Sequence, residues 1–227
     1  MTNLLPSDLW LMPLERLHLT ALEITHSLTS TEIKTILATM GSSTIATMTD
    51  YTYSHRARLI NPTLSYDGAA VALSFLPAAG ESLSSSPLNP TPSNPVQERN
   101  RARGEDMLKW RTKEDDKYTY HHLRRDLFNI ARSSGVSIDS RYVVPSSHIT
   151  VGRFLTQDDH DSKDKMELWF DKIEEINGWL KKEFWQKNGA ERDLNAEWVV
   201  GEEKGLDCRE GALWYGGGET VRLGKGF

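Results

Sequence analysis

The chain has 227 residues, a net charge of −5 and one cysteine. This length supports one large domain or two small lobes with a real core. The hydrophobic share of 38% and the charged share of 26% are ordinary for a globular protein. The acidic balance offers no global positive field for long nucleic acid, so duplex DNA is not an expected partner. An anionic ligand would have to be held by a local arrangement of groups.

The cysteine content and the apolar segments bear on the compartment. Cys208 has no second cysteine to pair with, which favours a reducing environment. The apolar runs are too short for a bilayer, and the N-terminal segment contains Pro6, Asp8 and Pro13 but no early Lys or Arg, a poor signal peptide. We expect a cytoplasmic or nuclear protein that is not secreted, contacts no membrane and is a monomer.

The N-terminal part of the chain predicts a strand followed by a helix. Residues 17–25 alternate with period two, as in a strand with one apolar face. Thr29 and Glu32 form a capping box, apolar residues follow at helical spacing, and Gly41 is expected to end the helix.

A hairpin and an insertion come next. Asp67-Gly68 separates the strand-like runs 64–66 and 71–75, which predicts a β-hairpin. Residues 80–103 are rich in Pro, Ser and Asn and have few large apolar side chains. We expect a flexible surface insertion there.

The second half alternates helices with strands. Helical spacing predicts a helix over 117–134, ended by Gly135, and another over 163–187. Strands are expected near 142–144, 147–155, 197–200, 212–215 and 220–223. The order of elements predicts an α+β fold in two similar halves, each with one histidine-bearing strand.

Two His-x-Thr motifs are the chemical signal in this chain. The first is His18 and Thr20, and the second is His148 and Thr150. Residues i and i+2 of a strand lie on one face, so each histidine stands beside its threonine. Two imidazoles can act as acid and base near neutral pH, and two hydroxyls can donate to the oxygens of a phosphodiester. The histidines are therefore catalytic candidates and the threonines phosphate-binding candidates, with no metal and no cofactor. Alternatively, each histidine is a half-buried strand residue satisfied by a neighbour.

The motifs also carry a resemblance to a known family. LHLTALEIT (17–25) and SHITVGRF (147–154) resemble the two signature strands of the 2H phosphoesterase superfamily. A fungal RNA ligase/cyclic nucleotide phosphodiesterase-like branch is similar over RARLINPTLSYDGAAVALSFLPAAGE (56–81), SRYVVPSSHITVGRF (140–154) and EWVVGEEKGLDCREGALWYGGGETVRLG (197–224).

The resemblance implies a bilobal, LigT-like fold for residues 1–227, a single domain of two pseudo-symmetric lobes. Its two mainly antiparallel sheets line a central cleft, with helices outside. It also implies metal-independent hydrolysis of a small cyclic phosphodiester: a 2′,3′-cyclic nucleotide, an RNA 2′,3′-cyclic phosphate end or an ADP-ribose cyclic phosphate. A nucleotide- or RNA-binding module without turnover, and an RNA ligase-like activity, are the alternatives.

Arg153 matches a basic residue often found three positions after the second threonine in RNA ligase-like members, where it would bind phosphate. Its strand parity is opposite to that of His148 and Thr150. It would therefore face the site only if a bulge or strand end near Gly152 intervened. A surface arginine is the alternative.

Aromatic and histidine-rich positions complete the set of candidates. Tyr215, Trp214 and Tyr53 could stack on a base, although such residues are more often core or rim residues. His121-His122 does not predict a metal site, because adjacent helix residues point in different directions.

Overall fold

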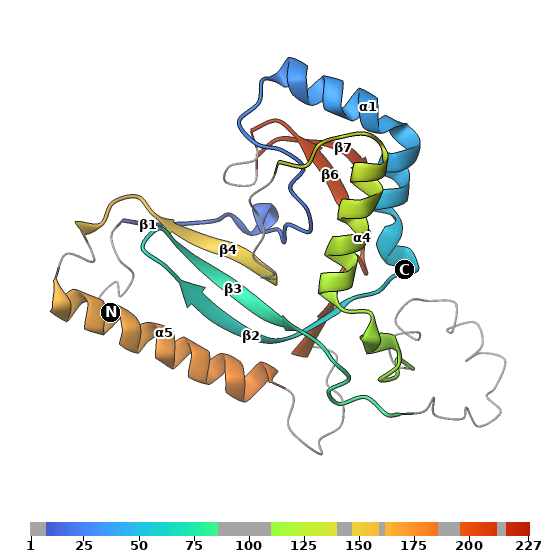
Figure 1. Ribbon diagram of the computed structural model, residues 1–227. Helices are drawn as coiled ribbons and strands as arrows, with labels where there is room; N and C mark the ends of the chain where they lie inside the picture. Colours follow the sequence, from blue (N-terminus) through green and yellow to red (C-terminus); the bar gives the residue numbers. More distant parts are fainter. Residues whose placement is uncertain (1–7, 86–109, 140–146, 159–161, 186–195, 213–216) are drawn as a thin grey trace.

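The computed structural model describes residues 8–85, 110–139, 147–158, 162–185, 196–212 and 217–227. Within these ranges the fold is mixed α+β (Figure 1). A five-stranded antiparallel sheet has the order β1–β4–β3–β2–β5, and a second sheet pairs β6 with β7. The strands are β1 (Leu9–Leu11), β2 (Arg58–Tyr66), β3 (Ala70–Pro77), β4 (Ser147–Phe154), β5 (Glu197–Val199), β6 (Asp207–Glu210) and β7 (Glu219–Leu223).

The predicted hairpin is confirmed as the connection between β2 and β3. Asp67 Oδ1 accepts hydrogen bonds from the backbone N–H groups of Ala69 and Ala70, both at 2.8 Å. The Asp67 N–H in turn donates to the Ala70 carbonyl oxygen at 3.0 Å. This turn sets the register of the two central strands of the sheet.

Helix α1 (Ser30–Thr49) begins at the predicted capping box, with Glu32 Oε2 accepting from the Thr29 N–H at 2.7 Å. Gly41 ends the first helical stretch of α1, as predicted, because its φ of 72° and ψ of 157° are not helical. A second helical stretch, which was not predicted, continues to Thr49. It buries Ile45 in a cluster with Ala131 of α4.

Helices α4 (Tyr120–Ser133) and α5 (Lys163–Phe184) confirm the two later helices. The buried residues of α4 follow the predicted stripe, and Gly135 ends the turn after it with φ 90°.

Figure 1 shows α5 lying across one face of the five-stranded sheet, while α1 and α4 lie beside β6 and β7. Asn177 of α5 hydrogen-bonds to both backbone groups of Leu64 in β2, at 2.7 and 3.2 Å. Short 3-10 helices span Leu14–Arg16 (η1), Tyr51–Tyr53 (η2) and Asp115–Lys117 (η3).

The expected strand over residues 17–25 is not a strand of either sheet. β1 ends at Leu11, η1 follows, and Leu19 then forms an isolated antiparallel bridge with Ile149. Leu11 pairs with Gly152, and Leu19 pairs with Ile149. Leu19 is eight residues after Leu11, whereas Ile149 is only three residues before Gly152, so five residues of the N-terminal segment are looped out. Pro13 has no N–H to donate to a ladder, which accounts for the interruption.

A buried ion network fixes the sheet to the segments on either side of residues 86–109. Arg58 in β2 is 1% exposed and binds Asp116 at 2.5 Å and Glu197 at 2.6 Å. Asp116 also accepts from Arg111 Nε at 2.7 Å and from the Gly80 N–H at 2.9 Å. Burial alone would raise the pKa of Asp116, but the two guanidinium groups outweigh it and lower the pKa. The network therefore joins the segment that ends at residue 85 to the segment that begins at residue 110.

Several expected features fall outside the described residues: the strand near 142–144, positions 86–103 of the insertion, and most of the strand at 212–215. The strands near 147–155, 197–200 and 220–223 are confirmed as β4, β5 and β7, whereas β6 was not predicted. Among the helices that the structure describes, none is both long and apolar enough to cross a bilayer.

Candidate active site

The structure places the two His-x-Thr motifs side by side. Leu19 lies opposite Ile149 in the antiparallel bridge. The two segments run in opposite directions, so the residue before Leu19 faces the residue after Ile149. His18 therefore lies beside Thr150, and Thr20 lies beside His148. The four candidate residues are thus brought together by one backbone contact.

The second motif lies on the polar face of the five-stranded sheet. His148 is opposite Ser74 on β3, and Thr150 is opposite Ala72. On β2, Ser65 is opposite Ala72, and its Oγ lies 2.6 Å from the Oγ of Ser74. Residues opposite one another in a ladder share a face, so these hydroxyls line the same surface as the motif. These serines were not among the residues predicted from the sequence, although the alternation of Leu73, Ser74 and Phe75 places Ser74 on the polar face of its strand.

A β-bulge in β4 separates the motif from Arg153. Thr150 is opposite Ala72, but the next pair is Gly152 with Val71, so β4 has one extra residue at Val151. A bulge of this kind changes which face the following residues occupy. Arg153 was expected to face the site only if a bulge or strand end lay near Gly152. Such a bulge is present.

Packing on the other face of the sheet agrees with this change of parity. Val151 and Phe154 are three positions apart, yet both pack in the cluster around Trp169 of α5. In a regular strand they would face opposite sides. Arg153 consequently lies on the face of Thr150. Their partners on β3, Ala70 and Ala72, are two residues apart, which corresponds to about 7 Å along the sheet.

The His18 ring is oriented by the 3-10 helix that precedes it. Its Nδ1 lies 2.8 Å from the carbonyl oxygen of Arg16, the last residue of η1. A carbonyl oxygen can only accept, so Nδ1 carries a proton and Nε2 is the other ring nitrogen available for chemistry. The His18 side chain is exposed.

The His148 ring has a different environment. It is half-buried, and burial, followed by the positive charges of Arg124 and His18, lowers its pKa from the ordinary value of 6.5. A lowered pKa favours the neutral imidazole, the form that can accept a proton. The effect of His18 on His148 also indicates that the two rings are close enough to interact.

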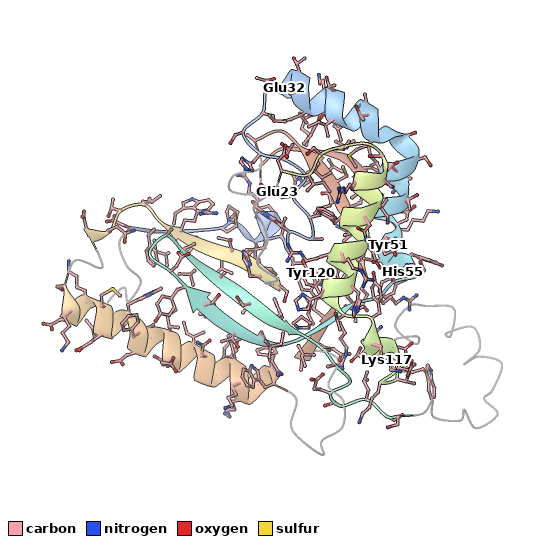
Figure 2. All side chains as sticks on the ribbon, viewed as in Figure 1. Glu23, Glu32, Tyr51, His55, Lys117 and Tyr120 are labelled. Atoms are coloured by element: carbon pink, nitrogen blue, oxygen red, sulfur yellow. The ribbon has the colours of Figure 1, made fainter. Side chains whose placement is uncertain are left out.

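Helix α4 supports the first motif through two residues that the sequence analysis did not identify. The Tyr120 hydroxyl donates to the Thr20 carbonyl oxygen, and Arg124 Nε donates to that of Ala21, both at 3.1 Å. Figure 2 shows Tyr120 on the side of α4 that faces the sheet. The sequence already placed these two residues four positions apart on a predicted helix. It did not indicate that they would contact the first motif.

Tyr53 is the aromatic candidate that the structure describes, and it is not brought to the motifs. Tyr53 is 54% exposed in η2, between Tyr51 and His55, which lie on the opposite side of α4 from Tyr120 in Figure 2. The other two candidates, at positions 214 and 215, lie outside the described residues.

The adjacent histidines have separate surroundings. His121 is exposed, whereas His122 Nδ1 accepts from the Thr119 N–H at 3.1 Å and caps α4. Across the part of the chain that the structure describes, no group of three or more His, Cys, Asp or Glu side chains could hold a metal ion.

Comparisons with protein-family models, curated proteins and solved structures found no match to this chain. A functional hypothesis therefore rests on the two motifs and on the geometry around them.

Proposed function

We propose that this protein is a metal-independent phosphodiesterase of the 2H type. Its substrate is a small cyclic phosphodiester: a 2′,3′-cyclic nucleotide, an RNA 2′,3′-cyclic phosphate end or an ADP-ribose cyclic phosphate. The observation that carries the proposal is the bridge between Leu19 and Ile149, which sets the two His-x-Thr motifs beside each other. In this proposal the five-stranded and two-stranded sheets belong to the two lobes of the 2H fold.

The reaction needs one base and one acid. Water forms a new P–O bond and gives its proton to the base, while the P–O bond to the sugar breaks and the sugar oxygen takes a proton from the acid. His148 suits the base because its lowered pKa keeps the ring neutral. His18 then protonates the leaving oxygen through Nε2, while the Arg16 carbonyl holds Nδ1.

The threonines provide the donors. Each lies beside the histidine of the other motif, so the hydroxyls of Thr20 and Thr150 can donate to the two non-bridging oxygens of a phosphate held between the rings. Preorganised donors of this kind stabilise charge that develops on those oxygens in the transition state.

The proposal is tested by assaying the purified protein in EDTA with 2′,3′-cyclic AMP and with an ADP-ribose cyclic phosphate. His18→Ala and His148→Ala should each lower kcat by about 10²–10⁴-fold, the usual contribution of an acid or base. His26→Ala and His121→Ala, at exposed positions outside both motifs, serve as matched controls and should retain full activity.

Turnover that survives both motif substitutions would refute the site, and turnover abolished by EDTA would refute the metal-independent mechanism. Calorimetry with AMP separates the alternative class. Tight binding without any product would identify a nucleotide-binding module instead.

A further inference from the structure

We infer that Arg124 is a phosphate-binding residue of this site, contributing from α4 a guanidinium that neither His-x-Thr motif contains. The inference rests on the proposed function, since it names the group that would hold the phosphate of that substrate.

Arg124 is held against the end of the first motif. It follows Tyr120 by four residues, so the two side chains lie on the same side of α4. Tyr120 bonds to the carbonyl of Thr20 and Arg124 to that of Ala21, the next residue. Helix α4 thus runs along the motif segment and places a half-buried guanidinium where the motif ends.

The same guanidinium also acts on the second motif. After burial, the charge of Arg124 is the next largest cause of the lowered pKa of His148, ahead of the charge of His18. Coulomb interactions weaken with distance and with solvent screening. Arg124, which bonds to Ala21 at the end of the first motif, is therefore also near enough to His148 to interact with it.

The way Arg124 is anchored suits it to an anion. The bond from Nε to the Ala21 carbonyl orients the planar guanidinium. A guanidinium has a planar fork of donors whose geometry matches two oxygens of a phosphate. A lysine at this position could offer a charge but not a bidentate contact.

The charge of the ligand gives a reason for such a cation. The chain as a whole is acidic, with a net charge of −5, so phosphate must be held by local groups. Threonine hydroxyls are neutral donors, and His148 is neutral in the proposed role of base, so His18, as the acid, is the positive group among these four residues. Arg124 is the described arginine whose charge lowers the pKa of His148, so it is placed to add a second positive charge.

The test uses inorganic phosphate and adenosine 2′-monophosphate as probes, titrated into protein with isotope-labelled histidines and followed by NMR of the His18 and His148 rings. Arg124→Gln removes the charge but keeps an N–H that can reach the Ala21 carbonyl. We expect it to weaken phosphate binding at least tenfold. Arg132→Gln, an exposed arginine in the last turn of α4, is the matched control and should change the Kd less than twofold.

A second readout separates charge from structure. Without the guanidinium, the pKa of His148 should rise, so its NMR titration midpoint moves to higher pH in Arg124→Gln. In Arg124→Lys the midpoint should stay near that of the wild type, while the phosphate Kd rises several-fold because the fork is lost.

The outcomes distinguish the two proposals. Wild-type protein that binds phosphate as tightly as a folded Arg124→Gln variant overturns the role of Arg124 and leaves the phosphodiesterase proposal standing. Wild-type protein that neither binds the probes nor turns over substrate overturns the proposed function itself. If Arg124→Gln does not fold, Arg124→Lys decides, and an unchanged phosphate Kd in that variant overturns the inference.

Discussion

The hydroxyl of Tyr120 donates a hydrogen bond to the carbonyl oxygen of Thr20 at 3.1 Å and so joins helix α4 to the first His-x-Thr motif. Tyr120 has no exposed surface. Because the motif segment belongs to no strand, its position depends on contacts of this kind, with the bridge to Ile149 on one side and α4 on the other.

Tyr120→Phe should keep the ring packed but remove this bond. We expect a loss of about 1 kcal/mol in the free energy of unfolding, the usual net value of one hydrogen bond. We also expect a lower kcat, because Thr20 and His18 lose a support. Urea denaturation and turnover of 2′,3′-cyclic AMP measure the two effects. Tyr53→Phe, at an exposed position, is the control, and equal behaviour of the two variants would contradict the prediction.

The lowered pKa of His148 predicts a pH dependence of stability. The unfolded chain binds this proton near the ordinary pKa of 6.5, whereas the folded chain binds it only at lower pH. Below about pH 6.5 the unfolded state therefore holds more protons, and the free energy of unfolding falls as the pH falls. His148→Gln lacks this contribution, so it should lose less stability than the wild type between pH 7 and pH 5. Denaturation curves at both pH values check this, and parallel losses in the two proteins would disprove it.

Asp116 compensates two buried guanidinium groups, Arg58 and Arg111, in the ion network. Asp116→Ala would remove a buried carboxylate from both, leaving Arg58 paired with Glu197 alone, and should cost about 3–5 kcal/mol in the free energy of unfolding. Glu114→Ala removes an ion pair to Lys117 whose side chains are 72% and 73% exposed, and it should cost less than about 1 kcal/mol. Chemical denaturation of the two variants provides the comparison. A small effect at Asp116 would mean that the network adds little to stability.

The position of Arg153 predicts a dependence on substrate length. It shares the face of Thr150 but lies beyond the bulge, so a mononucleotide at the motifs would reach it less readily than a longer RNA end. Arg153→Met should therefore lower kcat/KM more for a short RNA with a 2′,3′-cyclic phosphate than for 2′,3′-cyclic AMP. Equal losses on both substrates would place Arg153 at the scissile phosphate instead.

The elements that the sequence predicted well are those fixed by local patterns. The turn at Asp67-Gly68 and helices α4 and α5 follow from turn chemistry and from apolar spacing. The second motif was predicted in a strand and lies in one, because β4 has partners on both sides.

The failures arise where a distant contact decides the conformation. Gly41 does interrupt the helix, but the second helical stretch after it was not predicted, because it is stabilised by burial of Ile45 in a cluster with Ala131 of α4. The first motif has strand periodicity, but Pro13 and the looped-out residues before it leave a single bridge. Arg124 could not be identified as a site residue from the sequence, because its proximity to His148 exists only once α4 lies along the motif.

An antiparallel bridge has a local two-fold axis, and at Leu19 and Ile149 this axis passes between the two motifs. The backbone alone would make the two histidines equivalent. Their surroundings break that symmetry, because His18 is exposed with a carbonyl at Nδ1, whereas His148 is half-buried near the charge of Arg124. In the proposed reaction, η1 and α4 would consequently decide which histidine is the base and which the acid, and two copies of one motif could differ in role without differing in their reactive residues.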